Sequence, residues 1–124
     1  MIRGIGLDIV DLSRFGESLT RPGFVDRVFA PAEMTRAPKE ASAARMLDYL
    51  AGRFAAKEAL AKALATPRDL SWHDAQLRPG ENGQPEFVLS GGVRTRAEDL
   101  QVKHVHVSIT HDGGVAAAVV VLEG

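Results

Sequence analysis

Two carboxylates stand inside segments whose other residues suit a buried strand and a buried helix. Asp8 lies in residues 4–11, where apolar residues alternate with glycine, and Glu58 lies in residues 42–65, where small and apolar residues recur at helical spacing. Glu58 falls on the same stripe as Phe54, which predicts that it faces the core. A buried carboxylate is costly unless a cation or hydrogen bonds compensate it. The two segments are therefore expected to pack so that both acids share a hard cation such as Mg²⁺.

Each acid also has an ordinary structural explanation. Asp8 taken alone suits a strand-end residue that accepts hydrogen bonds from a turn. Glu58 and Lys62 have the i, i+4 spacing of an ion pair on a helix surface, which stabilises a helix by a few tenths of a kcal/mol. That pair explains Lys62, but it does not explain why Glu58 falls on the helix stripe that should face the core. A lysine one turn after a metal-binding carboxylate also suits a pyrophosphate.

The order of periodic segments predicts an α+β fold in one domain that spans residues 1–124. A strand over 2–11 leads into a short helix that ends at Leu19 and is capped by Asp11 or Ser13. Residues 24–29 form an apolar connector of undecided type, and a short helix starts near 30–34. The longest helix covers 42–65. The remainder is β-rich, with expected strands, turns and a helix over 72–77, 79–85 (turn), 87–89, 90–100 (helix), 104–110, 112–114 (turn) and 115–122.

Glycines on the first strand indicate a close approach. Gly4 and Gly6 share the face of Asp8, while Ile5, Leu7 and Ile9 share the other face. A strand glycine often marks a place where another backbone or a ligand comes near. This glycine face and the apolar terminal strand, residues 115–122, either support an oligomer in which a partner covers surface or fill an internal core.

Composition excludes several classes. The chain has no cysteine, so thiolate zinc sites, disulfides and cysteine nucleophiles are ruled out. No apolar run approaches the ~20 residues that span a bilayer, and the start does not resemble a signal peptide, so we expect a cytoplasmic protein that does not bind membranes. Seven basic residues stand against three acidic ones between positions 36 and 68. That excess favours a local anion site rather than nucleic-acid binding, because few aromatic residues are interleaved.

Polar residues near the end of the chain suggest further ligands. Ser108 and His111 are expected to donate hydrogen bonds to an anion at a strand end. His104 and His106 share a strand face, but two histidines alone are weak support for zinc. Ser108 lacks the surrounding glycines of a nucleophile elbow, which argues against a serine hydrolase.

Three blocks together closely resemble the short holo-[acyl-carrier-protein] synthases, which are phosphopantetheinyl transferases. The blocks are residues 4–11 with Arg14, residues 53–64, and residues 106–112. They occur in the order and at the spacing of that family, and the similarity covers essentially the whole chain. The resemblance implies a phosphopantetheinyl transferase-like fold. It also implies transfer of 4′-phosphopantetheine from coenzyme A to a serine of apo acyl carrier protein, in support of fatty acid biosynthesis, with release of adenosine 3′,5′-bisphosphate.

The resemblance also implies roles for individual residues. Asp8 and Glu58 match the Mg²⁺ ligands, and Lys62 matches a residue close to the pyrophosphate; these three form the expected catalytic set. Arg14 and its helix match the surface that receives the acidic carrier protein, and we add Arg21 to that surface. The small members of the family are homotrimers with each active site shared between adjacent subunits. The expected coenzyme A contacts are Arg53, Lys62, Ser108 and His111.

Departures from the family pattern and open alternatives remain. Where the family commonly has Gly-Thr-Gly, this chain has residues 65–67, Ala-Thr-Pro, and its usual Gly-Lys-Pro turn is Gly-Gln-Pro at 83–85. The general base is either Glu58 or a water on the metal. Carrier specificity, the use of acylated coenzyme A and the metal in the cell stay open. Two rival functions are a Mg²⁺-dependent phosphohydrolase and a non-catalytic module that binds coenzyme A or a nucleotide.

Overall fold

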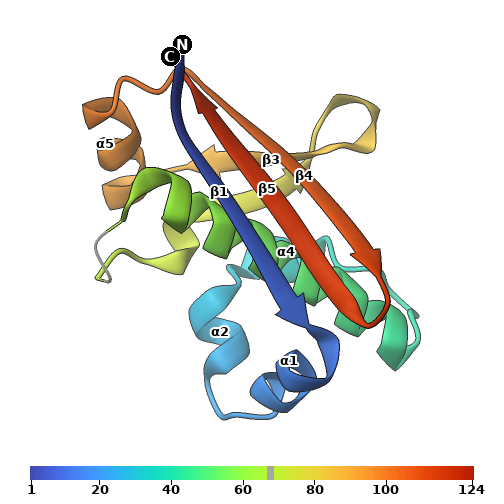
Figure 1. Ribbon diagram of the computed structural model, residues 1–124. Helices are drawn as coiled ribbons and strands as arrows, with labels where there is room; N and C mark the ends of the chain where they lie inside the picture. The colour runs from blue at the N-terminus through green and yellow to red at the C-terminus, as the bar shows by residue number, and fades with distance from the viewer. Residues whose placement is uncertain (67–68) are drawn as a thin grey trace.

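The computed structural model describes residues 1–66 and 69–124 and has the expected α+β composition (Figure 1). In chain order the elements are β1 (Ile2–Asp11), α1 (Leu12–Leu19), α2 (Phe24–Val28), α3 (Pro31–Thr35), α4 (Ala43–Leu64), the 3-10 turn η1 (Trp72–Asp74), β2 (Ala75–Pro79), the 3-10 turn η2 (Glu81–Gly83), β3 (Pro85–Leu89), α5 (Gly91–Asp99), β4 (His104–Asp112) and β5 (Val115–Glu123). The undecided connector is the short helix α2, and the strand expected from Trp72 begins only at Ala75.

The first strand and the last two strands form one antiparallel sheet in the order β1-β5-β4 (Figure 1). β5 is central, and its inward residues, Ala116, Ala118, Val120 and Leu122, are buried. The register sets Asp8 opposite Ala118, and Ala118 opposite Ile109. The predicted turn at 112–114 joins β4 to β5, with positive φ angles at both of its glycines. A separate hairpin, β2-β3, turns at the predicted Asn-Gly pair.

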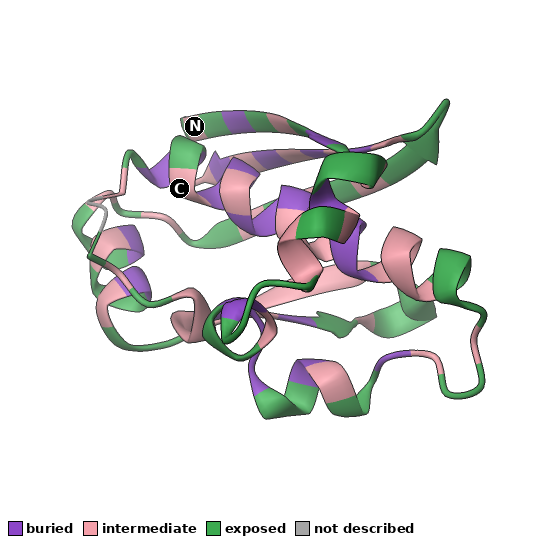
Figure 2. Cartoon of the chain, turned by 90° about the horizontal axis from the view of Figure 1, so that it is seen from below, coloured by how far each residue is buried: buried purple, intermediate pink, exposed green. Residues whose placement is uncertain are grey.

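The long helix α4 packs across the inner face of the three-stranded sheet (Figure 2). Close approach requires small residues on both sides. A Cβ at Gly6 would overlap the carbonyl oxygen of Ala59, and one at Gly4 would overlap that of Ala63. The predicted close approach is therefore confirmed, and the element that approaches is the backbone of α4. Ser42 caps the start of the helix, since its Oγ accepts from Arg45 N at 3.1 Å.

The predicted core stripe of α4 is wrong in phase. Glu58 is only half-buried, whereas residues on both sides of it are fully buried. The helix is enclosed by the sheet on one side and by the α2–α3 segment and the β2-β3 hairpin on another, so a single stripe of three-and-four spacing underestimates its buried surface. The buried residues of α4 are Leu50, Ala51, Gly52, Ala55, Ala56, Lys57, Ala59, Leu60, Ala63 and Leu64.

Of the two explanations for the glycine face, the internal core is confirmed, so this face gives no support for a partner. That face of β1 is covered by α4 of the same chain, because glycine lets the two backbones touch. The uncovered face is the opposite one, where Ile5, Leu7 and Ile9 are 67%, 60% and 64% exposed. A row of large apolar side chains in water is unusual for a monomer and marks an interaction surface.

α4 ends at Leu64, and Ala65 takes the left-handed conformation with φ 48° and ψ 52°. The sequence placed this end at Thr66 and Pro67; Pro67 lies outside the described residues. Within the described ranges, no helix combines the length and apolar character that a membrane crossing requires.

Candidate active site

The predicted metal ligands line one groove, which we call the carboxylate groove. It encloses about 360 Å³ between β1, α1 and α4. Asp8 enters from the inner face of β1 and Glu58 from α4. The packing of glycines against the α4 backbone brings these two elements close enough for the carboxylates to share the space. The residues that line the groove are Asp8, Ile9, Val10, Asp11, Arg14, Phe15, Glu17, Ser18, Arg21, Phe54 and Glu58.

Lys62 joins the groove through Asp8. Its Nζ donates to Asp8 Oδ1 at 3.0 Å and to the carbonyl oxygen of Leu7 at 3.0 Å. The Asp8 side chain is 15% exposed, whereas that of Lys62 is 55% exposed. An ion pair with so exposed a partner contributes little to stability. Lys62 is therefore free to exchange its contact with Asp8 for one with an incoming anion.

Within residues 1–66 and 69–124, no ion pair or side-chain hydrogen bond is formed by the Glu58 carboxylate. Burial raises its pKa above the ordinary value, the neighbouring Asp8 carboxylate raises it further, and Lys62 partly opposes both effects. Two carboxylates facing one space repel each other until a cation or a proton arrives. The ion pair of Glu58 with Lys62, the ordinary structural explanation of these residues, is not formed; Lys62 pairs with Asp8 instead.

This donor set fits a hard divalent cation. Both side chains offer carboxylate oxygens, the ligands that Mg²⁺ prefers, and Mg²⁺ commonly completes its shell with water and substrate phosphates. Among the described residues, no group of three or more His, Cys, Asp or Glu side chains is arranged to hold a metal. Asp8 and Glu58 would thus supply a minority of the ligands.

The predicted carrier surface meets this groove. Arg14 and Arg21 both line it, and both are exposed. Arg14 lies in the first turn of α1, where the Asp11 carboxylate caps the helix by accepting from Arg14 N at 2.9 Å. The rim of the groove is therefore positively charged, whereas its interior carries the two carboxylates.

The predicted coenzyme A contacts do not all gather here. The Arg53 guanidinium stacks on the ring of Tyr49, 3.6 Å from its centroid. His111 Nε2 lies 2.7 Å from the carbonyl oxygen of Asp48, on the face that meets α4. Ser108 is exposed on the opposite face of β4, because residues three apart on a strand point to opposite sides. The expectation that Ser108 and His111 meet one anion is therefore wrong within a single chain.

His104 and His106 are not arranged as a pair of zinc ligands. Their rings lie 6.3 Å apart, and His106 Nε2 is 3.0 Å from Glu123 Oε1. This hydrogen bond to His106 lowers the pKa of Glu123.

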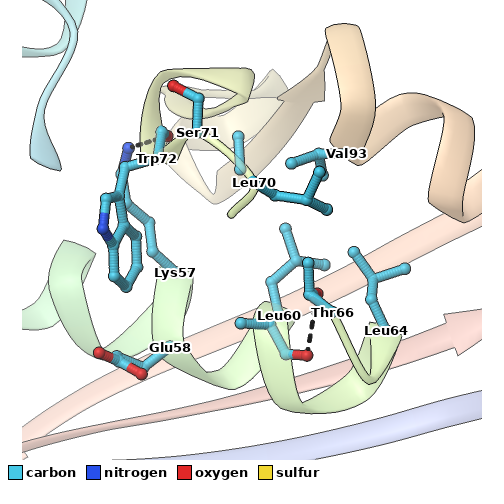
Figure 3. Close-up of a pocket in the computed structure, with 11 residues that line it drawn as sticks. Lys57, Glu58, Leu60, Leu64, Thr66, Leu70, Ser71, Trp72 and Val93 are labelled. Carbon is cyan, nitrogen blue, oxygen red and sulfur yellow. Dashed lines mark hydrogen bonds between the residues drawn. The ribbon is translucent and has the colours of Figure 1, made fainter. Parts of the chain in front are cut away.

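A second space opens on the other side of Glu58 (Figure 3). We call it the apolar cavity; it encloses about 230 Å³ between α4, Thr66, residues 70–75 and α5. Glu58 belongs to the walls of both spaces. The sequence carries no signal for this cavity, since its walls come from segments whose contact depends on the tertiary fold. The lining residues are Lys57, Glu58, Leu60, Ala61, Leu64, Thr66, Leu70, Ser71, Trp72, Ala75 and Val93.

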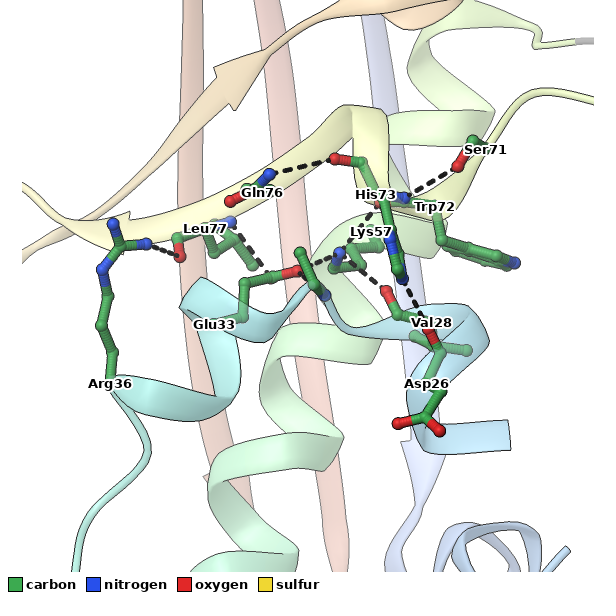
Figure 4. Close-up of polar contacts among 11 residues, drawn as sticks. Asp26, Val28, Glu33, Arg36, Lys57, Ser71, Trp72, His73, Gln76 and Leu77 are labelled. Carbon is green, nitrogen blue, oxygen red and sulfur yellow. Dashed lines mark hydrogen bonds and ion pairs between the residues drawn. The ribbon is translucent and has the colours of Figure 1, made fainter. Parts of the chain in front are cut away.

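A buried ion pair beside the site was also missed (Figure 4). Lys57 Nζ donates to Glu33 Oε1 at 2.7 Å and to the carbonyl oxygens of Val28 and Trp72, each at 3.0 Å. Glu33 also accepts from the backbone N–H groups of Ala30 and Leu77. This pair ties α3, η1 and β2 to α4. A lysine in an alanine-rich helix normally predicts a solvated side chain, so the sequence carried no signal for it.

Comparison with known proteins assigns the family. Residues 4–120 match the family model described as the 4′-phosphopantetheinyl transferase superfamily. A holo-[acyl-carrier-protein] synthase of Streptomyces griseus is 49% identical, and the alignment covers all of both chains. The crystal structure of the holo-[acyl-carrier-protein] synthase from Neisseria meningitidis has a TM-score of 0.86 and 32% identity, again over all of both chains. The Helicobacter pylori holo-[acyl-carrier-protein] synthase in complex with coenzyme A has a TM-score of 0.79 and 30% identity, over 96% of this chain and 99% of that one.

The chain belongs to the 4′-phosphopantetheinyl transferase superfamily and, within it, to the holo-[acyl-carrier-protein] synthases. It is accordingly an enzyme of the transferase class, and the fold expected from the resemblance is confirmed.

Proposed function

We propose that the protein, as one transferase domain over residues 1–124, transfers 4′-phosphopantetheine from coenzyme A to a serine of apo acyl carrier protein. Adenosine 3′,5′-bisphosphate is the second product, and the reaction depends on Mg²⁺. The observation that carries this proposal is the meeting of Asp8, Glu58 and Lys62 at one groove whose rim is cationic. Support of fatty acid biosynthesis in the cytoplasm is the setting that this proposal implies.

The serine oxygen attacks the phosphorus that bears the pantetheine, and the bond from that phosphorus to the bridging pyrophosphate oxygen breaks. Such a transfer needs alignment and charge neutralisation more than covalent chemistry from the protein. Held by Asp8 and Glu58, Mg²⁺ would neutralise charge on the pyrophosphate oxygens. Lys62 Nζ exchanges Asp8 for a phosphate oxygen. The Glu58 carboxylate, whose pKa is raised by burial and by Asp8, is our candidate to accept the serine proton.

Arg14 and Arg21 orient the carrier. Acyl carrier proteins of this system are acidic, and two exposed guanidinium groups beside the carboxylates would hold an acidic helix with its serine at the groove. Arg53 and His111 keep their proposed roles as coenzyme A contacts. Each would have to leave its present partner, Tyr49 and the Asp48 carbonyl respectively, or bind through another atom.

We further propose a homotrimer. The exposed row of Ile5, Leu7 and Ile9 supports it, because a partner that covers these side chains removes a large apolar surface from water. Ser108 lies on the same outer face, where its register partner is Val119. It would therefore serve a site of the adjoining subunit, which is consistent with active sites at subunit interfaces. Light scattering on the wild-type and Leu7→Glu proteins tests this: the variant is expected to have one third of the wild-type mass.

The decisive experiment measures the mass of apo acyl carrier protein after incubation with the protein, coenzyme A and Mg²⁺. A gain of one phosphopantetheine, lost on chelation of the metal, is expected. A phosphohydrolase would release the bisphosphate without any carrier, and a binding module would leave both substrates unchanged. Either result would remove the proposed function.

A further inference from the structure

The buried pair of Lys57 and Glu33 is an unusual way to hold a core together (Figure 4). Both side chains are fully buried. Charges taken out of water recover their desolvation cost only in good geometry, and apolar side chains of similar volume often give equal or greater stability. An apolar replacement, however, packs without fixed directions, and cores that keep only their volume lose a unique arrangement before they lose stability. The pair therefore suits a role in positioning.

The pair attaches α4 to α2, α3, η1 and β2 by hydrogen bonds with fixed directions (Figure 4). All three hydrogens of the Lys57 ammonium group are donated, so this group cannot turn without losing a bond. The Glu33 carboxylate accepts from two backbone N–H groups in addition to Lys57. These bonds hold α4 in one position relative to the four elements. Their backbone partners are Val28, Ala30, Trp72 and Leu77.

β1 holds the same turn of α4 from the side of the sheet. Gly6 lies so close to the carbonyl oxygen of Ala59 that a Cβ at this position would overlap it. Lys57, Glu58 and Ala59 are consecutive, and successive residues of an α-helix point about 100° apart. Both neighbours of Glu58 are thus fixed, one by the buried pair and the other by β1. The direction of Glu58 follows from theirs.

The separation of the two carboxylates depends on these contacts. Asp8 follows Gly6 by two residues on the same face of β1, and it lines the carboxylate groove together with Glu58. A shift of α4 relative to β1 would therefore move one carboxylate relative to the other. Mg²⁺ tolerates little of this, because it demands near-ideal octahedral geometry with bonds of about 2.0–2.1 Å.

We propose that Lys57 is a positioning residue of the metal site. Paired with Glu33, it holds α4 against β1 so that Asp8 and Glu58 have the separation that one divalent cation needs before the cation binds. Lys57 acts through the backbone of α4, since none of its ammonium hydrogens is left for a ligand. This inference rests on the metal site of the proposed function, and it adds the charges that hold the ligands of that site in place.

A double variant that keeps the core volume but removes the directed bonds tests this role. In Lys57→Met/Glu33→Leu, apolar side chains replace both charges, and urea denaturation is expected to show a folded protein. Electron paramagnetic resonance then measures the binding of Mn²⁺ in the absence of coenzyme A and carrier. The dissociation constant is expected to rise about 10-fold or more, as for other metal sites that lose the groups supporting their ligands.

Two further variants are matched to this one. Arg78→Met/Glu86→Leu makes the same substitutions at an exposed ion pair, and it is expected to change the Mn²⁺ dissociation constant by less than about 2-fold. Lys57→Arg keeps the charge and the donors but alters their reach, so its constant is expected to lie between those of the wild type and the double variant. Lys57→Arg also decides the test if the double variant does not fold.

The Mn²⁺ dissociation constants can contradict the role in three ways. An unchanged constant in the double variant, or in Lys57→Arg if only this variant folds, would show that the pair is merely structural. An equal rise in the Arg78→Met/Glu86→Leu control would overturn the role as well, because the effect would not depend on the buried pair. The absence of Mn²⁺ binding by the wild type would overturn it too, because the site would then not exist before the substrates bind.

Kinetics separates this inference from the proposed function. In a protein that transfers phosphopantetheine, the double variant is expected to need about 10-fold more Mg²⁺ for its half-maximal rate. The KM for the carrier, which depends on Arg14 and Arg21 at the groove rim, is expected to stay unchanged. Weaker Mn²⁺ binding in the double variant, without transfer by the wild type, would remove the proposed function and keep the positioning role. Transfer by the wild type, with Mn²⁺ binding that is the same in both proteins, would do the reverse.

Discussion

Lys57 and Glu58 are neighbours on α4, yet their charges have opposite surroundings. Lys57 is 2% exposed, and its three ammonium hydrogens reach Glu33, Val28 and Trp72. Glu58 is half-buried between two open spaces, has a raised pKa and faces the like charge of Asp8. Lys57 completes a closed polar network, whereas Glu58 faces a second carboxylate whose partner, Lys62, is largely exposed.

The difference separates a structural charge from a functional one. Burial lowers the pKa of Lys57, and Glu33 offsets part of that effect, so each partner depends on the other. Removing one partner of such a pair leaves an uncompensated charge in the core. Partial burial and the nearby Asp8 carboxylate make the charge of Glu58 costly in the free protein to a smaller degree, and a bound cation can relieve that cost. Buried, satisfied charges hold the fold, whereas open, unsatisfied charges prepare a site.

Breaking the closed network is expected to have the largest effect. Lys57→Met should lower the free energy of unfolding by about 3–5 kcal/mol, because Glu33 remains buried without its cation. Urea denaturation measures this. The double variant Lys57→Met/Glu33→Leu should recover most of the loss.

The exposed pair Arg78–Glu86, 2.6 Å apart, provides the control. Arg78→Met should change the free energy of unfolding by less than about 1 kcal/mol. Equal losses in Lys57→Met and Arg78→Met would show that burial of the pair has no consequence.

Neutralising Glu58 is expected to reduce catalysis rather than stability. Glu58→Gln is expected to reduce transfer by about 100-fold or more, since a metal ligand and candidate base is lost. The same change should raise stability by roughly 0.5 kcal/mol at neutral pH, a small gain because the site is partly solvated.

The pH dependence of that gain follows from the raised pKa of Glu58. Between its ordinary and its raised pKa the folded state binds more protons than the unfolded state, so wild-type stability falls as pH rises through this interval. The advantage of Glu58→Gln should thus be present above the folded-state pKa of Glu58 and absent at acid pH. Urea titrations at several pH values check it, with the exposed Glu81→Gln as control; a larger advantage at acid pH would contradict the assignment.

The smallest expected effect lies at the end of the same helix. Ala65 has a left-handed backbone, which costs a residue with a Cβ about 1–2 kcal/mol. Ala65→Gly removes that cost and adds about 0.4–1 kcal/mol of unfolded-state entropy, so a net gain near 0.5 kcal/mol is expected. Ala44→Gly, at an exposed position inside α4, should lower stability by up to about 1 kcal/mol. Thermal unfolding of the two variants should shift in opposite directions.

Local patterns in the sequence predicted most elements. The alternation of β1, the Asn-Gly hairpin turn and the alanine-rich helix all concern neighbours in the chain, whose preferences act without distant contacts. The resemblance in three blocks then identified the family. Contacts across the fold were predicted less well. The buried face of α4 was out of phase, the alternative pair of Glu58 with Lys62 is not formed, and the exposed row of Ile5, Leu7 and Ile9 was not anticipated.

The sequence by itself determined where most strands and helices form, that a backbone or a ligand comes near the glycines of β1, and that Asp8 and Glu58 lie on two elements that share a site. Only the tertiary structure decided that Lys57 is buried with Glu33, that Lys62 pairs with Asp8, and that an apolar cavity opens behind Glu58. The physical reason is the distance along the chain over which each effect acts. Backbone preference and periodicity act within a few residues, whereas the partner of a long charged side chain depends on which distant segments are packed around it.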